Sequence, residues 1–250
     1  MVSSRPKGYW IVGTDTGVGK TVVVGAISVA FQAQGLIPAM AKPIETGVSA
    51  DEKHKSDAAR LASLLPPAAG MSCLCLYQFE MPLAPLAAAR KAGMAMDLSY
   101  IETMCRSLVV QASMTLLEGV GGVKVPLTEH EDWLDLMVRL PLPCVVVGRA
   151  MLGGINHMLL TCEAILRRHL DIAAVVLNEW PGPALSETER EQMASTSALV
   201  RERLSIPVYG PLPFLATLSG CWRAGVHQLA TLPDLQRLVS QLKNTVVPTR

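Results

Sequence analysis

The feature that most constrains the fold is a short apolar run, a glycine-bearing loop and a long helix-compatible run in direct succession. The apolar residues 9–12 predict a buried strand, and residues 22–33 predict a helix that ends before Gly35. Between them, residues 13–21 have the sequence Gly-Thr-Asp-Thr-Gly-Val-Gly-Lys-Thr. Glycines let backbone N–H groups approach phosphate oxygens, and a helix N-terminus adds unpaired donors and partial positive charge. This order of elements therefore predicts a phosphate-binding loop.

Two side chains at the end of this loop carry the expected chemistry. Lys20 would reach the outer phosphates of a nucleotide, and the Thr21 hydroxyl would be a ligand of magnesium. The strict phosphate-loop pattern requires its first glycine at the position of Thr14, whereas this sequence has it one position earlier, at Gly13. A chance glycine turn in front of a core helix is the alternative, and Gly-Lys-Thr after a predicted strand disfavours it.

The composition is typical of a globular protein with one sizeable core. Half of the 250 residues are hydrophobic and the net charge is +1, which gives no electrostatic reason to expect binding to nucleic acid or an anionic membrane. No run of about twenty apolar residues predicts a membrane span, and residues 1–8 lack the apolar region of a signal peptide. We therefore expect a cytoplasmic protein.

The cysteines are scattered through apolar sequence. In a cytoplasmic protein we expect them to be reduced core thiols. They are Cys73, Cys75, Cys105, Cys144, Cys162 and Cys221. Cys73 and Cys75 have no second cysteine pair at ligand spacing, which disfavours a metal site there.

Apolar runs alternate with helix-compatible segments along the rest of the chain. Further strands are predicted at 36–41, 114–117, 144–147, 173–177 and 206–209, and helices at 57–65, 99–112, 155–168 and 186–204. Several strands are apolar throughout, which is typical of a parallel sheet covered on both faces. The sequence thus predicts an α/β fold of the P-loop NTPase type, with a doubly wound, mostly parallel sheet. One domain is expected over residues 1–250, with a frayed tail at 244–250.

Two Ser-x-x-Glu sequences have the spacing of capping boxes. They lie at residues 99–102 and 186–189 and predict helix N-termini at those serines. A surface helix is expected around Trp133, and no role is assigned to its acids Asp132 and Asp135.

Polar residues follow several predicted strands. Lys42 opens a loop at residues 42–47 that leaves the second strand, Glu118 ends the strand at 114–117, and Asn178 ends the strand at 173–177. Such sheets bind ligands at the carboxyl ends of their strands. We therefore expect Lys42, Glu118 and Asn178 to gather beside the phosphate loop.

Each candidate residue also has a structural alternative. Glu118, at the end of a buried strand, would either coordinate a metal ion or pair with a neighbouring cation. Asp57 would be either a second carboxylate ligand or a surface acid that complements the helix dipole. Lys42 could be a solvated loop lysine, and His157 could be either a ligand contact or a locally hydrogen-bonded side chain.

Several ordered stretches together resemble the dethiobiotin synthetase family, ATP-dependent carboxylases that close the ureido ring in biotin synthesis. The stretches are residues 13–21, 42–47 (Lys-Pro-Ile-Glu-Thr-Gly), 56–57 (Ser-Asp), 118–122 (Glu-Gly-Val-Gly-Gly), 126–127 (Pro-Leu), 152–161 (Leu-Gly-Gly-Ile-Asn-His-Met-Leu-Leu-Thr), Asn178 and 211–215 (Pro-Leu-Pro-Phe-Leu). They span most of the chain in the family's order, and the displaced first glycine is itself a family feature. Gly-Lys-Thr is shared by many nucleotidases, whereas the combination is specific.

The resemblance implies a role for each matched stretch. Phosphate contacts would come from Gly17, Val18, Gly19, Lys20, Thr21 and Val22. Further nucleotide contacts would come from Gly119, Val120 and Gly121, and adenine contacts from Asn178, Pro213, Phe214 and Leu215. Lys42 would be catalytic together with Lys20, and Mg²⁺ would be held by Thr21, Asp57 and Glu118. Thr46 would contact the substrate, and its carboxylate would bind Gly153, Gly154, Ile155, Asn156 and His157 across the interface of a homodimer.

The sequence departs from the family at three places. Residues 82–85 (Pro-Leu-Ala-Pro) are followed by Leu86, where the family often has a histidine, and the loop 149–151 differs from the usual forms. Residues 216–228 have no family match, and Gly220 stands where some members contact the nucleotide with an acid. These departures concern the nucleotide contacts more than the chemistry.

The implied reaction uses ATP, Mg²⁺, CO₂ or bicarbonate, and 7,8-diaminopelargonate. One amine takes up CO₂ as a carbamate, ATP phosphorylates the carbamate, and the other amine attacks the mixed anhydride and releases phosphate. Such phosphoryl transfer depends on positioning and charge stabilisation, and no side-chain nucleophile is required.

Two other functions remain open. Another amide- or ring-forming ligase of the same fold, such as a cobyrinate amidase, would need a glutaminase domain, for which 250 residues leave no room. A switch ATPase of the MinD/ParA kind would have a second lysine early in its phosphate loop, where this chain has Asp15.

Overall fold

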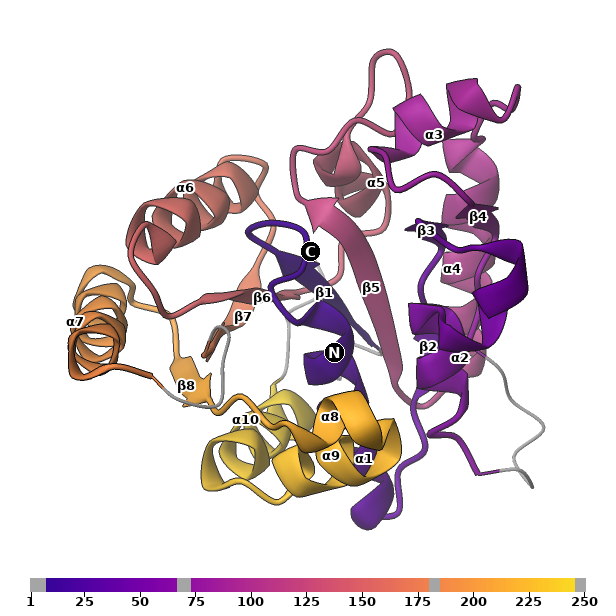
Figure 1. Ribbon diagram of the computed structural model, residues 1–250. Coiled ribbons are helices and arrows are strands. Elements are labelled where there is room, and N and C mark those ends of the chain that lie inside the picture. Colours follow the sequence, from indigo (N-terminus) through magenta and orange to yellow (C-terminus); the bar gives the residue numbers. More distant parts are fainter. Residues whose placement is uncertain (1–7, 67–72, 180–184, 246–250) are drawn as a thin grey trace, which may run out of the picture.

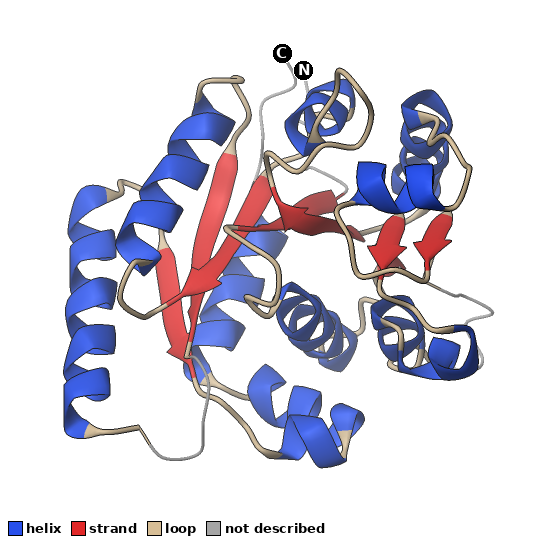
Figure 2. Cartoon of the chain, turned by 45° about the horizontal axis from the view of Figure 1, so that its top comes forward, coloured by secondary structure: helices blue, strands red, loops and turns tan. Residues whose placement is uncertain are grey.

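The centre of the molecule is a six-stranded, all-parallel sheet. The computed structural model describes residues 8–66, 73–179 and 185–245 and is shown in Figures 1 and 2. The strand order is β2-β5-β1-β6-β7-β8. The strands are β1 (Gly8–Gly13), β2 (Ala39–Ala41), β5 (Thr115–Gly122), β6 (Cys144–Arg149), β7 (Ile172–Asn178) and β8 (Val208–Leu212). The predicted parallel α/β sheet is confirmed.

Helices cover both faces of this sheet (Figure 2). On β1, Tyr9 and Ile11 face a core that includes residues of α1, α9 and α10, whereas Trp10 and Val12 face a core that includes residues of α4, α5, α6 and α7. The helices are α1 (Lys20–Ala33), α2 (Asp57–Ala62), α3 (Pro85–Lys91), α4 (Leu98–Gln111), α5 (Trp133–Arg139), α6 (Gly154–Leu166), α7 (Glu187–Arg203), α8 (Thr217–Gly220), α9 (Trp222–Ala230) and α10 (Pro233–Asn244), with a 3₁₀ helix η1 at Ala50–Lys55. A strand buried on both faces explains the unbroken apolar sequence of β1.

A second, two-stranded sheet corrects the expected loop at residues 42–47. Within it, β3 (Ile44–Thr46) pairs in parallel with β4 (Tyr77–Phe79). The Pro43 carbonyl accepts hydrogen bonds from the N–H groups of Leu76 and Tyr77, each at 3.0 Å. Strands of three residues are too short to show a period, so neither was predicted.

Three further boundaries differ from the predictions. The strand expected at residues 114–117 continues to Gly122, so Glu118 lies inside β5 and not beyond its end. The last strand is β8 at Val208–Leu212 instead of residues 206–209. Asn244 ends α10 and does not begin a frayed tail; residues 246–250 lie outside the described residues.

Two predictions about helix starts had different outcomes. Ser186 caps α7 in a complete capping box with Glu189, as predicted. At α4, however, the N-cap is Asp97, whose side chain accepts the backbone N–H groups of Ser99 and Tyr100. The capping position at Ser99 was therefore wrong: α4 begins one residue earlier, at Leu98, and the Asp97 carboxylate caps it.

The helix around Trp133 is also not a surface helix. Trp133 is 1% exposed, and its ring meets that of Trp10 edge to face with centroids 5.8 Å apart. Asp132 and Asp135 form a capping box at the start of α5. Cys221 is exposed and not part of the core, whereas Cys105, Cys144 and Cys162 are buried.

Among the described residues, no helix is both long and apolar enough to cross a bilayer.

Candidate nucleotide and metal site

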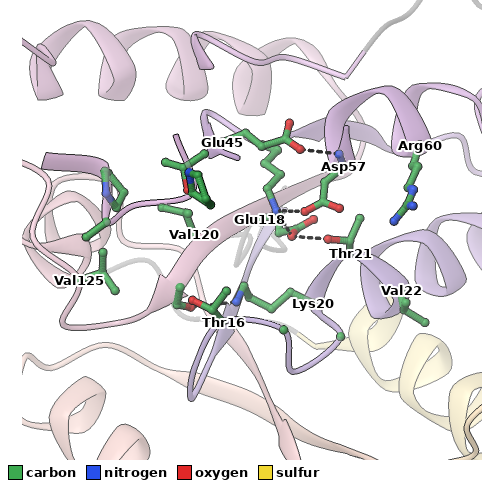
Figure 3. A pocket seen from close by; sticks show the side chains of 18 of the residues that line it. Thr16, Lys20, Thr21, Val22, Glu45, Asp57, Arg60, Glu118, Val120 and Val125 are labelled. Atoms are coloured by element: carbon green, nitrogen blue, oxygen red, sulfur yellow. Dashed lines mark hydrogen bonds and ion pairs between the residues drawn. The ribbon is translucent and has the colours of Figure 1, made fainter. Parts of the chain in front are cut away.

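A cavity of about 500 Å³ lies where β1 and β5 end and α1 begins. Figure 3 shows side chains around it from the phosphate loop with the first turn of α1, from β3, α2 and β5, and from the loop after β5 that carries Val125. The predicted site residues that line it are Gly17, Gly19, Lys20, Thr21, Val22, Lys42, Thr46, Asp57, Glu118, Val120 and Gly121. The gathering of Lys42 and Glu118 beside the phosphate loop is therefore confirmed.

The phosphate loop depends on glycine at two positions. Gly19 has a φ of +91°, and a Cβ there would lie 2.4 Å from the Asn178 amide nitrogen. That amide donates to the Val18 carbonyl at 2.7 Å and so ties the loop to the end of β7. At Gly13 a Cβ would lie 2.9 Å from Lys20 Nζ, which gives a physical reason for the displaced first glycine.

Lys20 is buried and its ammonium group is held by backbone. Nζ donates to the carbonyls of Asp15 at 2.8 Å and Gly121 at 2.9 Å. Burial lowers the pKa of Lys20 to about 8, against the opposing effect of the nearby Glu118 carboxylate. The side chain thus points across the mouth of the phosphate loop toward the end of β5.

Lys42, Asp57 and Glu118 meet around one nitrogen. Lys42 Nζ donates to Asp57 Oδ2 at 2.6 Å and to Glu118 Oε1 at 2.5 Å, and Thr21 Oγ1 donates to the same Glu118 oxygen at 2.7 Å. Lys42 is 4% exposed and Glu118 is fully buried. Lys42 is therefore not a solvated lysine, and Asp57, which is partly exposed in the first turn of α2, forms an ion pair with it. Glu118 does pair with a cation, and that cation belongs to the site.

Burial and ion pairing have opposite effects on the pKa values of these three side chains. Burial raises the pKa of Glu118 in spite of Lys42. Burial also acts to raise the pKa of Asp57, but the Lys42 ammonium outweighs it and holds that pKa below its usual value. The two carboxylates together overcome the burial of Lys42 and raise its pKa, so Lys42 stays protonated.

Glu45 is a site residue that the sequence interpretation missed. Its Oε1 accepts the Asp57 backbone N–H at 2.5 Å and its Oε2 accepts that of Ala58 at 3.4 Å. A buried carboxylate from β3 thereby caps the N-terminus of α2 and fixes Asp57 over the cavity. No local spacing signals this contact, because it joins two elements that are separate in sequence.

Arg60 and Trp222 also line the cavity, and neither was predicted. Arg60 lies on α2, one turn after Asp57, and its guanidinium carbon stands 5.7 Å from the centre of the Trp222 ring. Trp222 begins α9, in the segment without a recognised motif.

Some predicted site residues lie elsewhere. Gly119 packs against the Trp133 indole, on the side of β5 away from the cavity. Val18 lines a second cavity of about 190 Å³, together with Gly154 and His157. Gly153 and Asn156 are exposed, and Ile155 is half-buried. Within one chain the helix start at 153–157 is thus separate from the cavity that holds Lys42.

The stretches expected to contact adenine lie side by side. Asn178 ends β7 and Leu212 ends β8, and these two residues are paired in the sheet. The N–H of Phe214 donates to Glu179 Oε2 at 3.0 Å, and the Phe214 side chain is 38% exposed. Pro213, Phe214 and Leu215 follow β8 directly, so they border the strand end that carries Asn178.

The donor set at the cavity fits a magnesium ion. Mg²⁺ prefers a hydroxyl, one or two carboxylates and phosphate oxygens, and Thr21, Asp57 and Glu118 supply the hydroxyl and carboxylates. Glu118 Oε2 is buried and has no hydrogen-bond partner among the described residues. An unsatisfied carboxylate oxygen is costly unless a cation or donor occupies its site.

Sequence comparison gives consistent relatives. A family model described as an AAA domain matches residues 7–221. The chain is 44% identical over 172 residues to the ATP-dependent dethiobiotin synthetase BioD of Anaeromyxobacter dehalogenans (strain 2CP-C), which covers 69% of this chain and 76% of that protein. It is 36% identical over 209 residues to the protein of the same name from Bacillus cereus (strain B4264), covering 84% of each chain.

Comparison with solved structures supports the fold alone. The chain superposes on the MinC:MinD cell division protein complex of Aquifex aeolicus with a TM-score of 0.58 at 12% identity, covering 98% of both chains. It superposes on the cobyrinic acid a,c-diamide synthase of Mycobacterium smegmatis with a TM-score of 0.53 at 14% identity, again covering 98% of both.

Proposed function

Because this chain belongs to the family of ATP-dependent dethiobiotin synthetases, we propose that it closes the ureido ring of dethiobiotin. It is an ATP-dependent ligase, and its substrates are 7,8-diaminopelargonate and CO₂. The observation that carries the proposal is the Lys42 ammonium between Asp57 and Glu118, beside Thr21 at the mouth of the phosphate loop. This places fixed positive charge where the transferred phosphoryl group must pass.

The reaction proceeds in three bond changes. One amine of the substrate adds to CO₂ and loses a proton, which gives a carbamate. A carbamate oxygen attacks the γ-phosphorus of ATP and ADP leaves. The second amine attacks the carbonyl carbon of this anhydride and loses a proton to solvent, phosphate departs with the bonding electron pair, and the ring closes.

The chain's own groups orient and neutralise the reactants. Lys20 and Lys42 face the phosphates and the carbamate with positive charge in a buried pocket, where electrostatic stabilisation is strongest. Thr21, Asp57 and Glu118 would hold magnesium, which supplies further positive charge to the phosphate oxygens when bound. Thr46, at the end of β3, lines the same cavity and would hydrogen-bond the substrate.

The remote carboxylate of the substrate needs a second site. The helix start at residues 153–157 would bind an anion through the N–H groups that the helix leaves unpaired. The N–H groups of Gly154 and His157 are not among them, because they donate to the Met151 and Gly153 carbonyls. Since it lies apart from the Lys42 cavity of the same chain, we propose that a second copy of the chain supplies it in a homodimer.

The switch ATPase of the MinD/ParA kind is the alternative from a different class. The structural likeness to MinD supports the shared fold, but Asp15 occupies the position of the second lysine of that class. A switch ATPase hydrolyses ATP in response to a macromolecular partner and has no requirement for a diamine.

The test is an assay of ATP turnover with and without 7,8-diaminopelargonate and bicarbonate. Turnover that depends on both, with one dethiobiotin formed per ATP, is the expected result. Turnover that is indifferent to the diamine would overturn the proposal.

Replacement of Lys20 by alanine tests the nucleotide site itself. The variant should fold normally and lose turnover by about 10²-fold or more, because a charged donor to the phosphates is removed. Circular dichroism checks the fold and the same assay measures turnover. A folded variant with unchanged turnover would contradict the assignment of the loop.

A further inference from the structure

Arg60 is a cation on the wall of the cavity that the proposed function does not use. It is exposed on α2, three residues after Asp57, and both residues line the cavity. Among the described residues, Arg60 takes part in none of the salt bridges. Lys42, in contrast, forms ion pairs with two carboxylates.

Trp222 holds Arg60 in place at two points. The guanidinium lies over the indole ring, at 5.7 Å from its centre, and the indole Nε1 donates to the Arg60 backbone carbonyl at 3.0 Å. A guanidinium held over an aromatic face by cation–π attraction can still donate its N–H groups to an anion.

Trp222 is itself fixed against the helix that follows the phosphate loop. A Cβ on Gly25 of α1 would lie 3.2 Å from Trp222 Cζ2, so the indole occupies the space that glycine leaves. The neighbouring Arg223 donates to the Ser63 carbonyl at 2.8 Å. The start of α9 is therefore attached to both α1 and α2, on either side of the cavity.

The position of Arg60 indicates which part of a ligand it meets. Figure 3 shows Arg60 and Val22 on one side of the cavity and the head of Lys20 on the other. In a phosphate loop the lysine reaches the outer phosphates, while the loop backbone and helix start cradle the inner ones. Arg60 thus stands at the end of the cavity where the α- and β-phosphates bind.

We propose that Arg60, held by Trp222, binds the inner phosphates of the nucleotide. The proposal rests on the nucleotide site of the proposed function and adds a binding residue to it. The match to the family model ends at Cys221, so Trp222 lies just beyond the shared region. Residues 216–228, which have no recognised motif, thereby acquire a role: they carry the side chain that positions Arg60.

The experiment measures ATP and ADP binding by calorimetry in the presence of Mg²⁺. Arg60→Ala should weaken the binding of both nucleotides by a similar factor of about ten or more, because a charge-assisted hydrogen bond to a shared phosphate is lost. Arg60→Lys should bind with intermediate affinity, since it keeps the charge but not the planar fork. Arg203→Ala, at the exposed end of α7, is the matched control and should bind as the wild type does.

Two Trp222 variants test the positioning role. Trp222→Phe keeps a ring face for Arg60 and should bind ADP within about threefold of the wild type. Trp222→Ala should lose several-fold in affinity, and this loss should disappear in the Arg60→Ala background because the tryptophan acts through the arginine. Equal losses from Trp222→Ala in both backgrounds would show that it has only a structural role.

The remaining outcomes separate this inference from the proposed function. Unchanged nucleotide affinity in Arg60→Ala overturns the inference, as does a rise confined to the Michaelis constant for the diamino acid. A loss for ATP but not for ADP also overturns it, because the contact would then be to the terminal phosphate. Failure of the wild-type protein to bind ATP would instead overturn the proposed function.

Discussion

At the scale of single residues, the site is defined by one buried lysine shared between two carboxylates. Lys42 is 4% exposed, and it binds Asp57 and Glu118 at 2.6 and 2.5 Å. Two carboxylates this close cannot both stay charged without a cation between them. Lys42 therefore compensates the charge of both carboxylates in the free protein, as a divalent ion would when nucleotide is bound.

Replacement of Lys42 by methionine should expose this dependence. Without the ammonium, the buried Glu118 and the partly exposed Asp57 repel each other and take up a proton, so the variant should unfold at a lower temperature and lose turnover by about 10²-fold. Mg²⁺ should raise the unfolding temperature of the variant more than that of the wild type, because the ion replaces the missing charge.

Lys42→Arg is the matched control for this measurement. It keeps the charge, so it should show the smaller response to Mg²⁺ that the wild type shows. Equal responses of all three proteins in thermal scans would mean that these carboxylates do not hold the ion.

At the scale of elements, carboxylates stabilise the starts of two helices. Glu45 of β3 caps α2. In α5, Asp135 accepts the Asp132 backbone N–H at 2.8 Å and binds Arg168, beyond the end of α6, at 2.6 Å. One acid thus completes a capping box and joins two neighbouring helices.

Asp135→Asn should lower the free energy of unfolding by about 1 kcal/mol at pH 7. Burial acts to raise the pKa of Asp135, but the Asp132 N–H and Arg168 outweigh it and lower the pKa. A lowered pKa stabilises the folded state above the unfolded value of about 4 and ceases to do so as pH falls through the lower folded value. Urea unfolding should therefore show a constant difference from pH 5 to 7 that shrinks below pH 4.

The control for this prediction is Asp51→Asn, since Asp51 is exposed in η1. It should leave unfolding unchanged throughout. A difference between Asp135→Asn and the wild type that persists at pH 2 would show that charge is not its cause.

At the scale of the whole molecule, α6 presents a face that one chain leaves uncovered. Leu152 is 77% exposed, and Leu160 and Leu166 are 56% and 49% exposed. Leu152 directly precedes the helix start at 153–157, whereas Leu160 lies further along α6 and Leu166 ends it. A two-fold dimer would bring the same patch of each chain together and should bury upwards of about 1,000 Å² in total.

Asn156→Trp should raise the Michaelis constant for the diamino acid by about tenfold or more and leave ATP binding unchanged. The bulky side chain blocks the proposed carboxylate site but lies apart from the phosphate loop of its own chain. Steady-state kinetics and calorimetry measure the two effects.

Leu160→Glu should convert a dimer into monomers and remove turnover, whereas Leu199→Glu on α7 is the control and should do neither. Sedimentation at assay concentration measures the mass. A wild-type protein that is monomeric there and fully active would show that the substrate's carboxylate is held within one chain.

Local sequence was sufficient for the sheet and the phosphate loop. Buried parallel strands are apolar throughout, and the glycines at 13 and 19 are required by close contacts with Lys20 and Asn178. Because ligands bind at the carboxyl ends of parallel strands, Lys42 and Glu118 were expected in one site, and both line the same cavity. Apolar strands and the glycine loop can be recognised from adjacent residues, and the shared edge of a parallel sheet relates Lys42 to Glu118, which is why these features could be predicted.

The features that were missed depend on pairs distant in sequence. Trp222 and the Arg60 carbonyl are 162 positions apart, and Asp57 and Glu45 are 12 apart. The spacing of residues within a short stretch of sequence does not reveal such pairs, because they form only through tertiary packing. The same holds for Trp133, whose burial depends on Trp10.

The position of β1 in the sheet has a consequence for how the chain is made. This strand is synthesised early, but its neighbours β5 and β6 begin only at Thr115 and Cys144. The apolar side of α1 is covered later still, because α9 and α10 pack on it and are synthesised last. The Tyr9 hydroxyl can donate to the Leu242 carbonyl, at 2.6 Å, only after α10 has been made. A nascent chain therefore carries the nucleotide loop unsupported through most of translation, and chaperones that bind exposed apolar helices should find α1 first.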